Sequence, residues 1–119
     1  MSYVDGFVVP VPKDKIDAYR VMASKAAAVW REHGALQYVE AVGDDLEIKE
    51  VFPFTKLGTV QEGETVVFAW IMYKSREHRD EVNKKVMEDP RIKEMCDPKD
   101  MPFDCARMAY GGFKVIVES

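Results

Sequence analysis

The stretch ETVVFAWIMYKS, residues 64–75, contains eight consecutive apolar or aromatic residues between a charged start and a serine that can cap a helix. A strand with one face in water alternates apolar and polar residues, but this one is apolar on both faces. Small aliphatic side chains suit packing against helices, so we expect the face that carries them to meet the helices. The bulky face then needs a different cover. The small set is Val67, Ala69 and Ile71, and the bulky set is Val66, Phe68, Trp70 and Met72.

The remaining segments give the order β-α-β-β-α-β over residues 1–119, which we interpret as a single domain. This order is typical of a ferredoxin-like α+β fold, with a four-stranded antiparallel sheet and both helices on one face. We expect the first and third strands to be central and parallel to each other. The predicted elements are strands at 3–11, 36–42, 65–73 and 107–117 and helices at 13–33 and 76–89.

Helix boundaries are marked by capping residues. Gly34 provides a left-handed stop for the first helix, and Ser75 is a suitable N-cap for the second. Asp89-Pro90 and Asp97-Pro98 each have the pattern of a short helix that begins with a cap and a proline. The first helix has an apolar face of 3.6-residue period that consists of Ile16, Tyr19, Ala23, Ala26 and Trp30.

The uncovered bulky face predicts an interface. Each large apolar side chain left in water forfeits about 1.5–3 kcal/mol, and a contiguous patch of them marks an interface or a pocket. A second copy of the sheet, related by two-fold symmetry, is the simplest cover, and it gives a dimeric α+β barrel with a pocket between the sheets. We expect Tyr3, Phe7 and Val9 to join this face. The connection 44–63 is long, and we expect 51–57 to pack over the pocket mouth or against the partner.

Composition limits the classes of partner. The chain has 119 residues, a net charge of −4 and a pI of about 5.2, which does not favour nucleic acid as a partner. No apolar run approaches the roughly 18 residues that a membrane helix needs, and the N-terminus lacks the pattern of a signal peptide. Cys96 and Cys105 have neither disulfide-framework nor zinc-site spacing. We therefore expect a cytoplasmic protein with reduced thiols.

Asp5 is the most informative polar residue, because it lies within an otherwise apolar strand. A buried carboxylate needs a partner or a raised pKa, and Lys114 on the fourth strand is the partner that we expect. Asp5 is either a structural residue, in an ion pair or a hydrogen bond to a turn, or a general base in the pocket. Tyr38 and Glu40 share a face of the second strand. The candidate pocket consists of Asp5, Tyr38, Glu40, Phe68, Trp70, Met72 and Lys114.

The remaining reactive residue types indicate no cofactor. His33 falls in the last turn of the first helix, where a positive charge suits the helix dipole, and His78 falls in the first turn of the second. Their spacing from the cysteines matches no metal site and no haem-anchoring signature. Cys105 is expected to be a passive small side chain. Gly111-Gly112 lacks a phosphate-loop frame and indicates a bulge or a close backbone approach.

Several long segments resemble the YbaA-like bacterial family, a domain of unknown function. They are YVDGFVVPVPKDKIDAYR, VWREHGALQYVEAVGDD, VVFAWIMYKSREHRDEVNKKVM and MPFDCARMAYGGFKVIV. The resemblance implies a dimeric α+β barrel, a fold that also includes cofactor-free monooxygenases, lactone isomerases and haem enzymes. Some family members carry an RNA-related label, but this sequence has no RNP-type aromatic motif and no basic stripe.

Fold kinship by itself does not transfer function. The sequence predicts a homodimeric module that binds a small molecule between its sheets. The alternative is an enzyme of the cofactor-free monooxygenase or isomerase type that acts on a small organic substrate.

Overall fold

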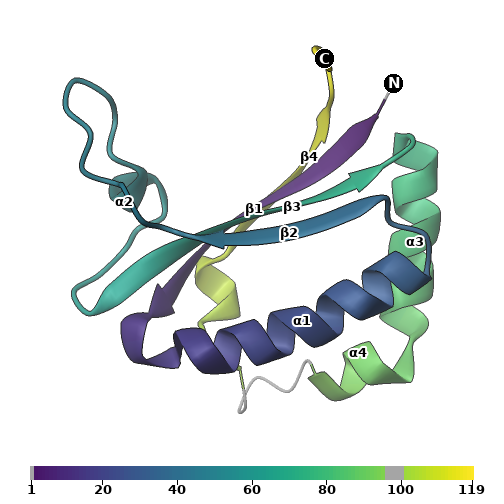
Figure 1. The fold of residues 1–119 in the computed structure, drawn as a ribbon. Helices are drawn as coiled ribbons and strands as arrows, with labels where there is room; N and C mark the ends of the chain where they lie inside the picture. Colours follow the sequence, from purple (N-terminus) through teal and green to yellow (C-terminus); the bar gives the residue numbers. More distant parts are fainter. Residues whose placement is uncertain (1, 96–100) are drawn as a thin grey trace.

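The computed structural model describes residues 2–95 and 101–119, which form a sheet with its longest helices packed on one face (Figure 1). The strands are β1 (Tyr3–Pro12), β2 (Gln37–Val42), β3 (Glu64–Tyr73) and β4 (Ala109–Lys114). The helices are α1 (Ile16–Glu32), α2 (Phe54–Leu57), α3 (Arg76–Glu88) and α4 (Pro90–Met95). Turns of 3-10 helix occupy Lys13–Lys15 and Cys105–Arg107, so the fourth strand is shorter than predicted. Within the described ranges, no helix has both the length and the apolar character required to cross a bilayer.

The sheet has the order β2-β3-β1-β4, and all neighbouring strands are antiparallel. The predicted ferredoxin-like arrangement is therefore confirmed. The expected parallel pairing of the first and third strands is wrong, because β1 and β3 pair antiparallel from Tyr3↔Tyr73 to Pro12↔Glu64. The crossover through α1 returns the chain so that β2 runs in the direction of β1, with space for one strand between them. The next connection reverses the chain, so β3 fills that space antiparallel to both neighbours.

The core lies between the sheet and the layer formed by α1, α3 and α4 (Figure 1). Val67, Ala69 and Ile71 of β3 are 3–4% exposed and face the helices, as predicted. Small side chains on α1 let its backbone approach the sheet, while Val82 and Val86 of α3 fill the core beside it.

The predicted caps are confirmed where the structure describes them. The Ser75 hydroxyl accepts a 3.1 Å hydrogen bond from the backbone N–H of His78, and Gly34 ends α1 with a φ of +118°. Asp89 caps α4, since its Oδ1 accepts from the backbone N–H of Arg91 at 2.9 Å. The predicted helix start at Asp97-Pro98 lies outside the described residues, as does Cys96.

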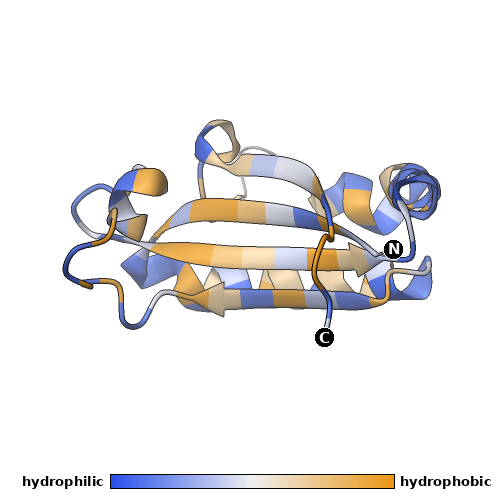
Figure 2. Ribbon diagram, turned by 90° about the horizontal axis from the view of Figure 1, so that it is seen from above, coloured by the Kyte–Doolittle hydropathy of each residue, from blue (hydrophilic) through white to orange (hydrophobic). Residues whose placement is uncertain are grey.

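The opposite, outer face of the sheet has only partial cover. Figure 2 views the molecule from this side and shows hydrophobic colouring along the central strands. Phe68 is 44% exposed, and Trp70 and Met72 are half-buried. The long connection covers one end: Phe54 of α2 contacts Phe68 edge-on at 5.8 Å between ring centroids, and Gly58 lies against Val66.

The segment 51–57 therefore packs down only in part. Phe54 meets the sheet, but Val51, Phe52 and Leu57 are each more than half exposed, at 59, 69 and 58%. Their apolar side chains extend the uncovered surface at that end of the sheet.

The expectation that Tyr3, Phe7 and Val9 join the outer face is wrong. They pair with Tyr73, Ala69 and Val67, whose side chains face the helices, so these β1 residues line the core. Alternation shows which residues of a strand share a face, but the register between strands decides which face that is.

Candidate functional site

A cavity of about 450 Å³ lies between the sheet and the helices. Its volume falls within the range typical of small-molecule sites. Most of its wall is apolar or aromatic, with residues that include Phe7, Ala26, Trp30, Ala69, Ile71 and Met87. The polar groups that interrupt this wall cluster around two carboxylates, Asp5 and Glu40.

Asp5 lies on β1 opposite Gly112 and is only 1% exposed. Arg79 Nη1 of α3 lies 3.3 Å from Asp5 Oδ1, but this oxygen has no aligned hydrogen-bond donor. Burial raises the pKa of Asp5 above its ordinary value, while the charge of Arg79 and the polar side chains of Asn83, Tyr110 and Tyr73 oppose that rise. A buried acceptor without a donor therefore borders an apolar cavity.

The prediction that Lys114 is the ion-pair partner of Asp5 is wrong. Lys114 lies opposite Tyr3, whereas the residue opposite Asp5 is Gly112, and the Lys114 side chain is exposed. The counter-ion instead comes from α3, and the sequence does not indicate where this helix crosses β1.

Arg79 is held from several sides. Its Nη1 donates to the Tyr110 hydroxyl at 2.8 Å, and its Nη2 donates to the Tyr3 hydroxyl at 3.3 Å. The guanidinium carbon lies 5.0 Å from the centroid of the Tyr3 ring, a cation–π arrangement. Asp80 adds a carboxylate 3.0 Å from Nε. The positive charge beside Asp5 is thus fixed in position.

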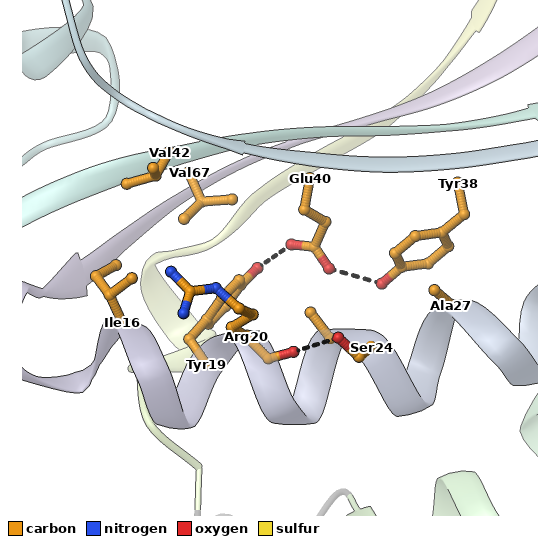
Figure 3. A pocket seen from close by; sticks show the side chains of 10 residues that line it. Ile16, Tyr19, Arg20, Ser24, Ala27, Tyr38, Glu40, Val42 and Val67 are labelled. Carbon is orange, nitrogen blue, oxygen red and sulfur yellow. Dashed lines mark hydrogen bonds between the residues drawn. The ribbon is translucent and has the colours of Figure 1, made fainter.

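Glu40 on β2 is the second carboxylate, and its direct partners are tyrosines. The Tyr38 hydroxyl donates to Oε2 at 2.7 Å, and the Tyr19 hydroxyl of α1 donates to Oε1 (Figure 3). Burial is the main cause that raises the pKa values of both phenols, and the neighbouring Glu40 raises them further. The two hydroxyls therefore stay protonated at neutral pH. These bonds join α1 to the edge strand β2.

A second hollow of about 250 Å³ lies on the other side of these tyrosines, between α1 and β2. Ile16, Arg20 and Ser24 are part of its wall (Figure 3). Tyr19, Tyr38 and Glu40 border both this hollow and the larger cavity. This hydrogen-bonded group, which we call the Glu40 partition, therefore separates the two spaces.

The residues of the predicted pocket divide between the two faces of the sheet. Asp5, Tyr38 and Glu40 lie on the helix side, because they share a face with Ala69 and Ile71. The second group lies on the outer face and comprises Phe68, Trp70 and Met72, while Lys114 is at the end of β4. Within one chain, the predicted set therefore does not form a single cavity.

Sequence reasoning did not select three residues that complete the polar cluster: Arg79, Asn83 and Tyr110. Asn83 Oδ1 accepts from Trp30 Nε1 and from the Tyr73 hydroxyl, each at 3.2 Å. Arg79 and Asn83 lie four residues apart on α3, which places them on one face of that helix. This spacing was the available signal, but it does not indicate that the face meets Asp5.

The histidines and Cys105 have structural or surface positions. His33 is the C-cap residue of α1, as predicted, and its Nε2 lies 2.8 Å from Asp89 Oδ2. His78 Nδ1 accepts from the backbone N–H of Lys74 at 3.0 Å, and Cys105 is exposed. Across residues 2–95 and 101–119, no three His, Cys, Asp or Glu side chains gather in a group that could hold a metal ion.

The fold is shared with a solved structure of low sequence similarity. An uncharacterized NIPSNAP domain protein from Burkholderia xenovorans superposes with a TM-score of 0.56 at 10% identity, covering 95% of this chain and 93% of that one. At this identity the similarity shows the fold alone.

Sequence comparison gives much closer relatives. The uncharacterized protein YbaA of Escherichia coli strain K12 is 52% identical over 118 residues, which cover 99% of each protein. YbaA of Shigella flexneri has the same identity and coverage. Residues 2–105 match the sequence model of the DUF1428 family, which is described as a protein of unknown function. The predicted YbaA-like relationship is confirmed, and the chain belongs to the DUF1428 family of bacterial proteins.

Proposed function

We propose that this protein binds a small organic molecule in the cavity between the sheet and the helices. The observation that carries the proposal is Asp5 Oδ1, a buried acceptor without a donor in the wall of a cavity of about 450 Å³. Buried polar groups in folded proteins almost always have a hydrogen-bond partner, and a ligand with a donor group would supply one here. The apolar wall would hold the body of that ligand.

The cavity can be tested with a neutral fluorescent probe, N-phenyl-1-naphthylamine. We expect saturable binding with increased fluorescence in the native protein. Ala69→Leu adds volume on the cavity side of the sheet, while Ala18→Leu adds the same volume at an exposed position on α1, outside both cavities. Binding that is lost in the first variant and retained in the second supports the cavity. Equal binding in both variants, with both folded, would refute it.

The second part of the proposal is that two chains form a homodimer through their outer sheet faces. Apolar side chains accumulate on that side: Phe68 is 44% exposed, and Phe113, which lies opposite Val4 in the sheet, is 58% exposed. Burying such a side chain stabilises by about 1.5–3 kcal/mol. In a two-fold symmetric dimer, both copies of these residues would be buried. Trp70 and Met72 of the two chains would lie in the same interface.

A catalytic role is the alternative, and one observation favours it. Asp5 lines the cavity, and burial raises its pKa, as suits a general base. In a reaction of the cofactor-free oxygenase or isomerase type, Asp5 would take a proton from the bound substrate. Turnover that disappears in Asp5→Asn but survives in His33→Ala would support this role, and binding without turnover would support the binding module.

We also propose that the protein is cytoplasmic and that it does not bind nucleic acid. The spacing of the two cysteines supports the location, since it matches no disulfide framework. The net charge of −4 supports the second point, because it repels phosphate backbones. Affinity for RNA that falls steeply with salt would contradict it.

A further inference from the structure

We propose that the ligand of this cavity carries a positively charged amine and that the ammonium group binds Glu40 between Tyr19 and Tyr38. This inference rests on the proposed function, because it concerns the chemical class of the same ligand. It follows from the charges of the cavity wall, the free acceptor capacity of Glu40 and the aromatic rings around it.

In the part of the chain that the structure describes, the cavity wall has one negative charge without a matching cation. Asp5 has Arg79 at 3.3 Å, so this carboxylate has its counter-ion. Glu40 makes no ion pair among the residues that the structure describes, and its direct partners are two neutral phenols. Arg20 lines the adjoining hollow, but it is paired with Asp17 at 2.9 Å and its side chain is 69% exposed, so solvent screens its charge.

Glu40 can accept more hydrogen bonds than it receives. An ionised carboxylate has about four lone-pair sites, and Tyr19 and Tyr38 each donate to one oxygen. An ammonium group has three donors and no acceptor, so it can bind the remaining sites without displacing either tyrosine. Because Glu40 borders the outer hollow as well as the cavity, an amine can approach it from the hollow.

Two further aromatic rings pack against the tyrosines that bind Glu40. Trp30 lies 6.0 Å from Tyr38 between ring centroids, and Phe103 packs edge-on against Tyr19 at 5.5 Å. Ring faces attract cations through their quadrupole, and the attraction is larger where water is excluded. The same surroundings suit an apolar body attached to the amine.

The opposite charge is disfavoured throughout the cavity. A ligand carboxylate would meet Glu40 at the partition and Asp5 at the β1 wall, and the guanidinium beside Asp5 is already engaged by Tyr3 and Tyr110. A neutral hydroxyl could donate to either carboxylate but would leave the charge of Glu40 uncompensated. The expected order of affinity is therefore amine, then alcohol, then acid.

Three probes with a common phenyl body test this order in the 119-residue protein: phenethylamine, 2-phenylethanol and 3-phenylpropionate. Their affinities are measured by displacement of N-phenyl-1-naphthylamine and by calorimetry near pH 7. We expect phenethylamine to bind about tenfold tighter than 2-phenylethanol, as a charged hydrogen bond predicts, and 3-phenylpropionate to bind weakest.

Glu40→Gln separates charge from shape, because glutamine retains the volume and one acceptor oxygen. In this variant we expect the preference for amine over alcohol to fall to about one, with alcohol affinity within about twofold of the native value. Glu62→Gln removes an exposed carboxylate outside both cavities and serves as the matched control, with the preference unchanged.

The outcomes distinguish this inference from the proposed function. If the naphthylamine probe binds but the native protein prefers alcohol or acid, or binds all three probes equally, the amine site is refuted and the binding cavity stands. The same holds if folded Glu40→Gln keeps the amine preference. If neither the naphthylamine nor any phenyl probe binds the native protein, the proposed function fails and the amine site fails with it. If Glu40→Gln does not fold, the order of affinities of the native protein for the three probes decides whether the amine site exists.

Discussion

Arg79 Nη1 lies 3.3 Å from Asp5 Oδ1, so one guanidinium of α3 neutralises the buried carboxylate at the centre of the sheet. Asp5 is 1% exposed and the Arg79 side chain is 15% exposed. The charge pair lies on the same side of the sheet as the cavity, and it connects the stability of the fold with the electrostatics of the candidate site.

Replacing Arg79 by methionine should destabilise the protein by about 3–5 kcal/mol, because it leaves the charge of Asp5 buried without a partner. Urea unfolding followed by circular dichroism measures the change. Arg76→Met, at an exposed position at the start of the same helix, is the control. The double variant Asp5→Asn/Arg79→Met should lose less than the sum of the single losses, and strictly additive losses would contradict the pairing.

The raised pKa of Asp5 should give the unfolding free energy a specific pH dependence. A carboxyl with a raised folded pKa contributes stability below its unfolded pKa, and that contribution is lost as pH rises through the folded pKa. The Asp5 contribution should therefore decline as pH rises above 3.8, the ordinary value from which its pKa is raised.

This decline is the slope to measure, by urea unfolding between about pH 4 and pH 7. Subtracting the profile of Asp5→Asn from that of the native protein isolates the contribution of this carboxyl. Arg79→Met should extend the decline to higher pH, since Arg79 opposes the rise in the pKa of Asp5. A flat difference profile would show that Asp5 titrates normally.

Phe68→Asp should convert the proposed homodimer into monomers, because two charges would face each other in a buried interface. Analytical ultracentrifugation at micromolar concentration measures the change in mass. Val21→Asp adds the same charge at a 57% exposed position on α1, in the helix layer, and should leave the mass unchanged. A native protein that sediments as a monomer would refute the dimer directly.

Gly112→Ala should destabilise the protein by about 1–3 kcal/mol through overpacking. A Cβ at this position would overlap the Tyr3 hydroxyl, which is in a buried residue and accepts from Arg79. Gly111→Ala is a matched control next to it, since its Cβ would meet the Phe113 ring at an ordinary 3.6 Å. Thermal unfolding of the two variants should differ clearly, and equal midpoints would argue against the close contact.

The sequence predicted the order of the elements and the two faces of β3, because these depend on local physics. The apolar run at 64–75 and the 3.6-residue period of the first helix follow from alternation and helix geometry, and Ser75 and Gly34 cap the helices as their chemistry predicts. The two faces of β3 followed from alternation, and the small size of Val67, Ala69 and Ile71 indicated which of them meets the helices.

The candidate site needed information that no local pattern contains. Asp5 and Glu40 were selected as isolated polar residues, but the sequence assigned them to a pocket between two sheets, whereas they face the helices. The register of β1 against β3 fixes that face, and a shift of one residue would reverse it.

The sequence by itself therefore determined the order of the elements, the caps and the two apolar faces of the third strand. Only the tertiary structure decided that β1 and β3 run antiparallel, that Arg79 rather than Lys114 neutralises Asp5, and that Tyr19 meets Glu40. The physical reason is the range of the interactions. Backbone propensity and capping act over a few residues, whereas strand register and helix position are set by packing between segments far apart in the chain.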